Sequence, residues 1–235
     1  MNSGEIMTTK LGLTPTGISG LDEIIGGGIP KGSVVMVSGG TGSGKSILAS
    51  QFLYNGITKF KESGFYISFD ERKKSMYKNL AKFGWNFSAY ESQKKFIFIE
   101  YPIHEAKEFL AQENTLFNLI VELEIERIVI DPITPLTMLY EDEHQKRQEM
   151  MKLIDTLRSW GTTTLLVSEQ KGKDDNTGIE PLCDGVIRLS EVEQRGYSVQ
   201  TLEVVKMRGA EIAKKPVPYK IGQNGIKLYP NVYFF

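Results

Sequence analysis

The sequence predicts an α/β fold: a mainly parallel central sheet sandwiched by helices, with an antiparallel extension near the carboxyl end. Up to residue 169, short runs of β-branched and aromatic residues alternate with longer helical runs. Continuous apolar strands alternating with helices are typical of a parallel sheet covered on both faces. After Gly185, strand-like runs follow one another without helices between them, which favours antiparallel pairing. No low-complexity linker interrupts the 235 residues, so we expect a single domain over 1–235 with a short lead at 1–10.

The elements follow in a regular order. The first strand (SVVMVSG) is almost entirely apolar, as a buried strand requires, and the later helical run EFLAQENTLFNLIVELE has apolar residues at 3–4 spacing. The five predicted parallel strands cover 33–39, 64–69, 95–101, 127–131 and 163–169, and the helices between them cover 46–60, 75–85, 108–124 and 143–161.

The carboxyl-terminal strands are predicted at 185–190, 197–207 and within 218–230. The pair Asn224-Gly225 in the last of these runs is a hairpin turn signal.

Composition limits the function. Hydrophobic residues make up 40% of the chain, which allows a sizeable core, and the formal net charge is −1. A globally basic nucleic-acid binder is excluded, so any such activity must depend on a local patch. The single cysteine, Cys183, cannot form an intrachain disulfide, which suits a reducing compartment. No apolar signal core or run of about 18 apolar residues occurs, so we expect a cytoplasmic protein without membrane contact.

A phosphate-binding loop is the strongest motif. GGTGSGKS fits G-x-x-x-x-G-K-[ST] and lies between a predicted buried strand and a helix. Its backbone N–H groups and the helix N-terminus offer partial positive charge to an anion. We expect Lys45 to reach the β- and γ-phosphates and Ser46 to ligate Mg²⁺. The predicted nucleotide-binding residues are Gly39, Gly40, Thr41, Gly42, Ser43, Gly44, Lys45 and Ser46.

Acidic residues end two of the predicted strands. Asp131 closes the apolar run RIVID, where a carboxylate is otherwise a poor strand residue, and it is the predicted second holder of Mg²⁺. Asp70 and Glu71 end GFYISFDE, at the sheet edge where ligands of open α/β sheets bind. One of them is expected to deprotonate the attacking water, with Glu71 favoured and Asp70 as its helper. Helix capping is the alternative role for all three acids.

At this point the chain resembles a known family. ISGLDEIIGGGIPKGSVVMVSGGTGSGKSILASQFLYNGI is similar to the opening of a KaiC-type domain of the RecA superfamily of ATPases, and the similarity continues through FDERKKSMYKNLAKFGW, RIVIDPIT, CDGVIRL and VVKMRG. It covers roughly Leu11 to Tyr229 and is most like the single-domain archaeal RadA paralogues. The resemblance implies a RecA-like core and ATP as the nucleotide, and the absence of a guanine-specifying N-K-x-D pattern agrees with ATP.

The resemblance also implies roles for particular residues. Asp70 and Glu71 fall where KaiC domains have two adjacent glutamates, and Asp70 is shorter by one methylene. Lys206 and Arg208 match a Lys-x-Arg-Gly segment that contacts the γ-phosphate of a neighbouring subunit. The two side chains lie two residues apart on one strand face, with no obvious anion in their own chain. A ring or filament of identical copies is therefore expected; a solvated sheet edge is the alternative.

Two segments occupy the places of DNA-contacting loops in RecA-type recombinases. They predict possible DNA contacts from Lys171, Lys173 and Tyr140. Glu169 or Gln170 is a possible sensor of the γ-phosphate. Against DNA binding, the first segment carries three consecutive acids at 141–143.

Two functions follow from these observations. The first is an ATPase that binds single-stranded DNA and modulates recombinational repair, with the RadA recombinase as a partner. The second is a KaiC-like signalling module that switches a protein partner by its nucleotide state, without DNA.

Overall fold

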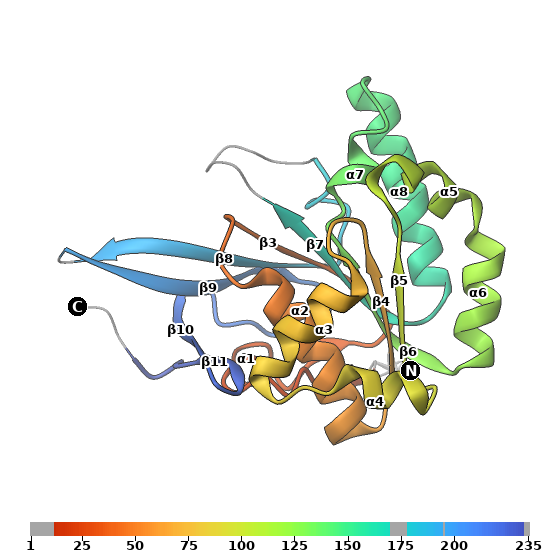
Figure 1. Cartoon of the computed structure of the whole chain (residues 1–235). Coiled ribbons are helices and arrows are strands. Elements are labelled where there is room, and N and C mark those ends of the chain that lie inside the picture. The colour runs from red at the N-terminus through yellow and green to blue at the C-terminus, as the bar shows by residue number, and fades with distance from the viewer. Residues whose placement is uncertain (1–11, 170–177, 195, 233–235) are drawn as a thin grey trace, which may run out of the picture.

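A sheet with the strand order β11-β10-β9-β8-β3-β7-β6-β4-β5 forms the centre of the molecule (Figure 1). The structure, a computed structural model, describes residues 12–169, 178–194 and 196–232. Pairing is parallel from β8 to β5 and antiparallel from β8 to β11, so the predicted fold class is confirmed. The elements are β1 (Leu13–Thr14), α1 (Leu21–Ile24), β2 (Ile29–Pro30), β3 (Val34–Gly39), α2 (Lys45–Asn55) with a π-helical continuation (Gly56–Phe60), β4 (Ser63–Ser68), α3 (Lys73–Leu80), α4 (Phe87–Ser92), β5 (Phe96–Glu100), α5 (Ala106–Ala111), α6 (Glu113–Glu122), β6 (Ile125–Asp131), α7 (Thr134–Thr137), α8 (Glu143–Ser159), β7 (Thr163–Glu169), β8 (Gly185–Gln194), β9 (Tyr197–Met207), β10 (Val217–Gly222) and β11 (Gly225–Leu228), with short 3₁₀ turns at Ala81–Phe83 and Ile103–Glu105.

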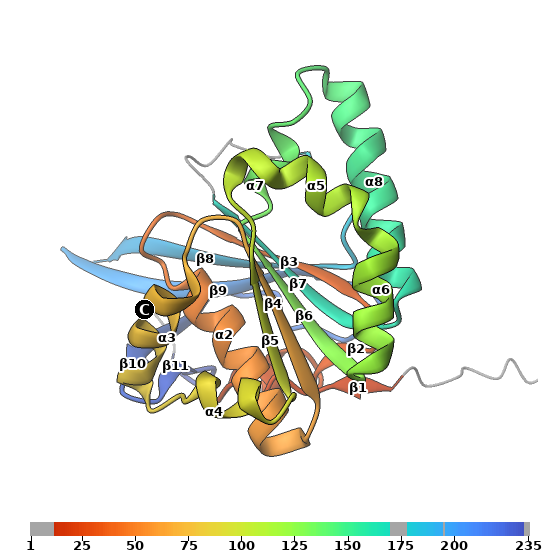
Figure 2. The same cartoon turned by 45° about the vertical axis from the view of Figure 1, so that its right-hand side comes forward.

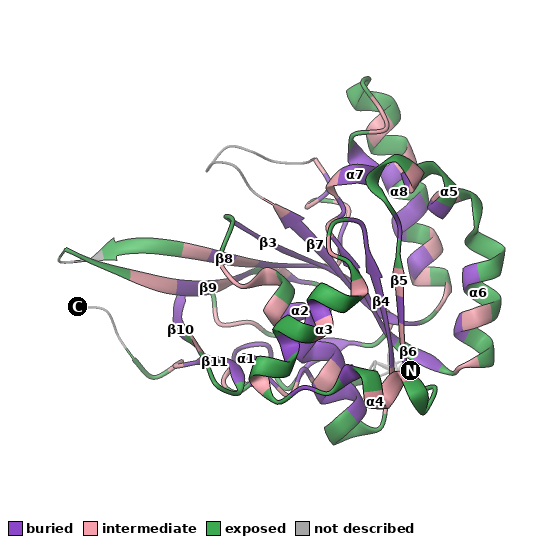
Figure 3. Cartoon of the chain, in the orientation of Figure 1, coloured by how far each residue is buried: buried purple, intermediate pink, exposed green. Residues whose placement is uncertain are grey.

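Helices cover both faces of the sheet. Helices α1 to α4 lie on one face and α5 to α8 on the other (Figures 1 and 2). Alternate residues of β3 divide between the two layers: Val35 and Val37 belong to the core cluster beneath α2, and Met36 belongs to the cluster beneath α8. The central parallel strands β3, β4, β6 and β7 are therefore almost entirely buried (Figure 3), which is why their sequences are mostly apolar. No helix in the described ranges is long and apolar enough to cross a membrane.

Several elements differ from the sequence expectation. The predicted helix at 108–124 is divided at Gln112 into α5 and α6, and helices α4 and α7 occupy segments where none was predicted. The predicted carboxyl-terminal hairpin forms, but Gly222 pairs with Gly225, so its turn lies one residue before Asn224-Gly225. Gly225 has φ +93°, and a Cβ there would lie 2.6 Å from both Gln51 Oε1 and a Trp85 ring carbon. A glycine is required at this position because the strand passes so close to α2.

Strand β9 contains a bulge near its end. Its register against β8 shifts by one residue at Val205. Val204, before the shift, and Met207, after it, both belong to the cluster beneath α2. Strict alternation would have placed Lys206 on that face instead of Met207. The bulge thus turns Lys206 away from that face, and both Lys206 and Arg208, which follows the strand, contact the segment 180–184.

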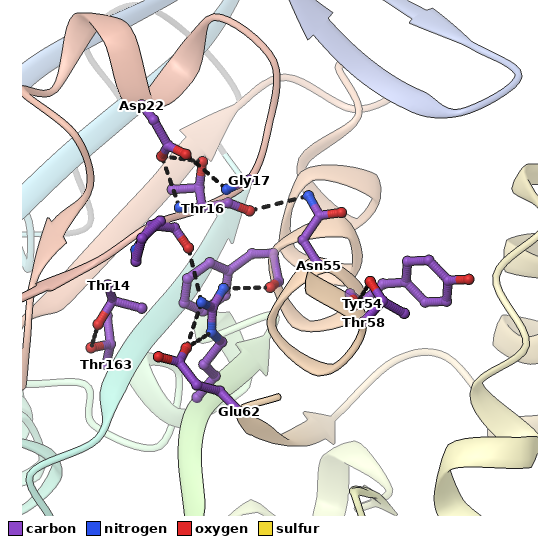
Figure 4. Close-up of polar contacts among 12 residues, drawn as sticks. Thr14, Thr16, Gly17, Asp22, Tyr54, Asn55, Thr58, Glu62 and Thr163 are labelled. Carbon is purple, nitrogen blue, oxygen red and sulfur yellow. Dashed lines mark hydrogen bonds and ion pairs between the residues drawn. The ribbon is translucent and has the colours of Figure 1, made fainter. Parts of the chain in front are cut away.

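A buried arginine ties β6 to the end of α2. The Arg127 side chain is fully buried and forms an ion pair with Glu62 at 2.5 Å (Figure 4). Its guanidinium also donates to the carbonyls of Phe52 and Pro15 and lies 4.5 Å from the centroid of the Phe52 ring. A buried charge needs such complete pairing. Arg127 therefore joins the phosphate-loop helix, the strand that ends in Asp131 and the amino-terminal segment.

Candidate nucleotide-binding site

The predicted phosphate loop turns from the end of β3 into α2. A Cβ at Gly39 would lie 2.4 Å from the Leu189 carbonyl oxygen of β8, so the turn demands glycine there. Gly44 caps α2 with φ +92°, and Lys45 begins the helix. A Cβ at Gly40 or Gly42 would meet nothing within 4 Å, so the loop is open on the side where a phosphate would lie.

Lys45 lies between the carboxyl ends of two neighbouring strands. Its ammonium donates to the Gly40 carbonyl at 2.8 Å. Burial lowers the pKa of Lys45, and the carboxylates of Glu169 on β7 and Asp131 on β6 partly offset this shift. Glu169, a predicted γ-phosphate sensor, accepts a hydrogen bond from Thr41 of the loop. The strand order thus brings these predicted residues together around the Lys45 amine.

Asp131 is held by hydroxyl groups from two elements. Its side chain is buried, accepts a hydrogen bond from the Tyr66 phenol at 2.5 Å and lies near the Ser46 hydroxyl of α2. Burial raises the pKa of Asp131, and the two neighbouring hydroxyls together with the Lys45 charge counteract the rise. Ser46, as a ligand, and Asp131, through water, were the two residues predicted to hold Mg²⁺, and the fold places them close together.

Glu71 is held toward the site, whereas Asp70 is exposed. Glu71 Oε1 accepts from Ser75 Oγ at 2.9 Å and from Asn79 Nδ2 at 2.8 Å, both on one face of α3. The Glu71 carboxylate also contributes to raising the pKa of Asp131, so the two acids lie near one another. Asp70 is exposed at the end of the turn.

Lys206 and Arg208 lie at the far edge of the sheet from the phosphate loop. Met207 pairs with Gly185 at the start of β8, so the carboxyl end of β9 adjoins the amino end of β3. The six residues of β3 separate these cations from the loop by roughly 16 Å at about 3.3 Å per residue.

The expectation that these cations lack an anion in their own chain is wrong for Arg208. Arg208 lies 3.6 Å from Asp184, with its side chain 60% exposed, and Lys206 donates to the carbonyls of Glu180 and Pro181 at 3.3 and 3.4 Å. The loop before β8 folds back under the end of β9 and supplies these partners, a contact that the sequence pattern does not indicate.

Two of the three predicted DNA contacts, Lys171 and Lys173, lie outside the described residues, as does the alternative γ-phosphate sensor Gln170. Tyr140 is partly buried and packs against the core cluster beneath α8. The acids at 141–143 are exposed beside it.

Residues 14–233 match the family described as "ATPase: KaiC". The chain belongs to the KaiC family of ATPases. It is 31% identical to the circadian clock oscillator protein KaiC of Prochlorococcus marinus over 92% of this chain and 46% of that protein, so it spans about half the length of this relative. It is 33% identical to a UPF0273 protein of Pyrococcus furiosus over 92% of this chain and 93% of that protein. A solved KaiC-like protein from Pyrococcus horikoshii OT3 superposes with a TM-score of 0.84 at 33% identity, covering 94% of this chain and all of that one. The resemblance to a KaiC-like RecA-superfamily domain is confirmed.

The residues present fit the metal that accompanies nucleotides in ATPases. Mg²⁺ prefers oxygen ligands and is usually bound through one or two protein groups plus substrate phosphates. The Ser46 hydroxyl and the Asp131 carboxylate supply two such oxygens beside the loop. No cluster of three or more metal-binding His, Cys, Asp or Glu side chains occurs in the part of the chain that the structure describes.

Three residues of this site were not predicted from the sequence. Ser75 and Asn79 hold Glu71, and Tyr66 holds Asp131. The spacing of Ser75 and Asn79, four residues apart in a predicted helix, was a usable signal. Tyr66 gave a weaker one: a tyrosine in an otherwise apolar buried strand needs a partner for its hydroxyl.

Proposed function

We propose that this chain binds ATP with Mg²⁺ at residues 39–46 and hydrolyses it with Glu71 as the base. The observation that carries the proposal is the gathering of Lys45, Asp131, Glu169 and Glu71 at the carboxyl ends of adjoining strands around an open glycine loop. Ligands of open α/β sheets bind at this edge.

Each group has a distinct part in the reaction. The loop N–H groups, the start of α2 and Lys45 offset the charge of the β- and γ-phosphates, once Lys45 leaves the Gly40 carbonyl. A magnesium ion held by Ser46 and Asp131 would neutralise and orient the same phosphates. Glu71 takes a proton from the attacking water as the new P–O bond forms and the bond to the β-phosphate oxygen breaks. Ser75 and Asn79 fix the Glu71 carboxylate for this transfer.

Replacing Lys45 with alanine is expected to weaken ATP binding roughly 10- to 100-fold, because charge-assisted hydrogen bonds contribute about 1.5–3 kcal/mol. Isothermal titration calorimetry measures the change. Lys31→Ala is the matched control, since Lys31 is exposed before the amino end of β3. An unchanged affinity for ATP in Lys45→Ala would show that the nucleotide lies elsewhere.

The proposal extends to a neighbouring copy. Lys206 and Arg208 cannot serve the nucleotide of their own chain from the opposite edge of the sheet. In a head-to-tail assembly, the same edge would face the phosphate loop of the next copy, and Arg208 would leave Asp184 for the γ-phosphate. The half-exposed guanidinium supports this arrangement because little packing has to break.

Arg208→Ala is expected to remove the rise of specific ATPase activity with protein concentration, leaving a rate roughly tenfold or more below the wild type at high concentration. Activity is measured over a dilution series beside the mass from light scattering. Arg147→Ala, at an exposed position on α8, is the control. If Arg208→Ala self-associates and hydrolyses ATP like the wild type, the shared site does not exist.

The nucleotide state is proposed to switch a protein partner, as in the second of the two functions. Tyr140 is packed and the acids at 141–143 repel phosphate, which favours this reading over a RadA paralogue on single-stranded DNA. DNA binding, with RadA as a partner, stays a prediction. Filter binding of single-stranded DNA over a salt series separates the two: a DNA-binding protein retains the strand at low salt and loses it steeply as salt rises.

A further inference from the structure

Tyr66 lies beside Asp131 because of the order of the parallel strands. Tyr66 pairs with Val129 of β6, and Asp131 follows Val129 by two residues, so both side chains point to the face that α2 covers. The Tyr66 phenol donates to Asp131 Oδ2 at 2.5 Å. Both residues are buried, Tyr66 with 3% and Asp131 with 8% of its surface exposed, so water competes little for this hydrogen bond.

The same phenol also contacts the phosphate-loop helix. Tyr66 has a second hydroxyl neighbour in Ser50, which is buried on α2. The Ser50 hydroxyl in turn donates to the backbone carbonyl of Ser46 at 2.7 Å. The Ser46 hydroxyl lies near Asp131, which completes a ring of neighbouring polar groups. Tyr66 is the member of this ring that touches both the strand and the helix carrying the two metal ligands.

Aromatic packing fixes the Tyr66 ring. It stacks on Phe98 of β5 with centroids 5.4 Å apart and an interplanar angle of 15°. Tyr77 of α3 packs edge-on against the other ring of this stack, Phe98, at 6.0 Å. The phenol therefore has little freedom to turn away from Asp131.

We propose that Tyr66 is a positioning residue of the magnesium site. By occupying Oδ2 of Asp131 and bracing the first turns of α2 through Ser50, it holds the remaining carboxylate oxygen and the Ser46 hydroxyl at a fixed separation for one metal ion. The inference rests on the proposed ATPase function and deepens it. Hydrogen-bond partners of ligating carboxylates typically change metal affinity by 10–100-fold when removed.

Tyr66→Phe tests this role because it removes only the hydroxyl and leaves the stack on Phe98. We expect the factor by which Mg²⁺ tightens ADP binding to fall about 10-fold, while ADP binding in EDTA stays at the wild-type value. Calorimetric titration of the full chain with ADP, with Mg²⁺ and with EDTA, gives both numbers without relying on turnover. Direct Mn²⁺ binding in the presence of ADP, followed by electron paramagnetic resonance, gives an independent measure.

Tyr77→Phe is the matched control, because its hydroxyl donates to Glu91 at 3.0 Å, outside the ring of contacts around Asp131. It should leave the Mg²⁺ factor unchanged. The inference would be overturned if Mg²⁺ tightened ADP binding by the same factor in Tyr66→Phe as in the wild type. It would also be overturned if Tyr66→Phe lost as much ADP affinity in EDTA as with Mg²⁺, since the defect would then not concern the metal.

A second variant keeps the test open if Tyr66→Phe does not fold. Ser50→Ala cuts the link between Tyr66 and α2 and is expected to lower the Mg²⁺ factor in the same direction; no change would overturn the bracing role. A wild-type protein that binds no ADP at all would instead overturn the proposed ATPase function. If Mg²⁺ tightened ADP binding clearly, and equally, in the wild type and in Tyr66→Phe, only the role of Tyr66 would be overturned.

Discussion

A glutamine at Glu71 is expected to slow ATP hydrolysis by about 100-fold or more, with ATP still bound at close to the wild-type affinity. The amide cannot take the proton of the attacking water, and general base catalysis typically contributes 10²–10⁴-fold. The glutamine carbonyl can still accept the hydrogen bonds of Ser75 and Asn79, so the local fold should survive. Single-turnover hydrolysis and calorimetric ATP binding, measured on the same preparation, separate the chemical step from binding.

Asp70→Asn is the control for this prediction. Asp70 is exposed, whereas Glu71 is held by α3, so the asparagine variant should lose much less activity. The sequence alone left the choice of base between these two neighbours. A larger loss in Asp70→Asn than in Glu71→Gln would reverse the assignment.

Glu62→Ala is expected to lower the free energy of unfolding by about 3 kcal/mol or more. Removing one partner of a buried ion pair typically costs 3–5 kcal/mol, because the other charge stays buried without compensation. Glu62 is the one carboxylate within ion-pair distance of Arg127 among the described residues, and the Arg127 side chain has no exposed surface. Urea unfolding followed by circular dichroism measures the change.

Two further variants identify the cause of that loss. Glu126→Ala changes the exposed carboxylate next to Arg127 in β6 and should stay within roughly 0.5 kcal/mol of the wild type. Glu62→Leu combined with Arg127→Met removes both charges and should recover much of the stability, since an apolar replacement of a buried pair is often neutral or better. If the double variant is as unstable as Glu62→Ala, the loss reflects packing and not an unpaired charge.

The sequence predicted those parts of the molecule that follow from local patterns. The predicted parallel strands contain apolar runs, and the loop from Gly39 to Ser46 has the spacing of a phosphate-binding loop. Asp131 followed from its place at the end of a buried strand. The short helices α4 and α7 were not predicted because four to six residues are too few to establish a helical period.

Contacts that depend on strand order could not be predicted. Tyr66 meets Asp131 only because β4 lies next to β6, an adjacency between strands about 60 residues apart that no local pattern encodes. The ion pair between Arg208 and Asp184 could not be predicted for the same reason, because it requires the loop before β8 to lie under β9. The contacts of Ser75 and Asn79 with Glu71 depend in the same way on how the turn after β4 meets helix α3.

Because of the bulge at Val205, the faces on which the last β9 side chains lie depend on the number of residues in the strand and not on which residues they are. Deleting one residue before Lys206 would leave the following sequence unchanged. It would nevertheless move each following side chain of the strand to the opposite face of the sheet. Met207 would then face solvent, and both cations would enter the apolar layer beneath α2. Insertions and deletions at this point are therefore expected to be far more harmful than substitutions, and a homologue with one residue fewer here would not carry the same pair of charges on this face of the sheet.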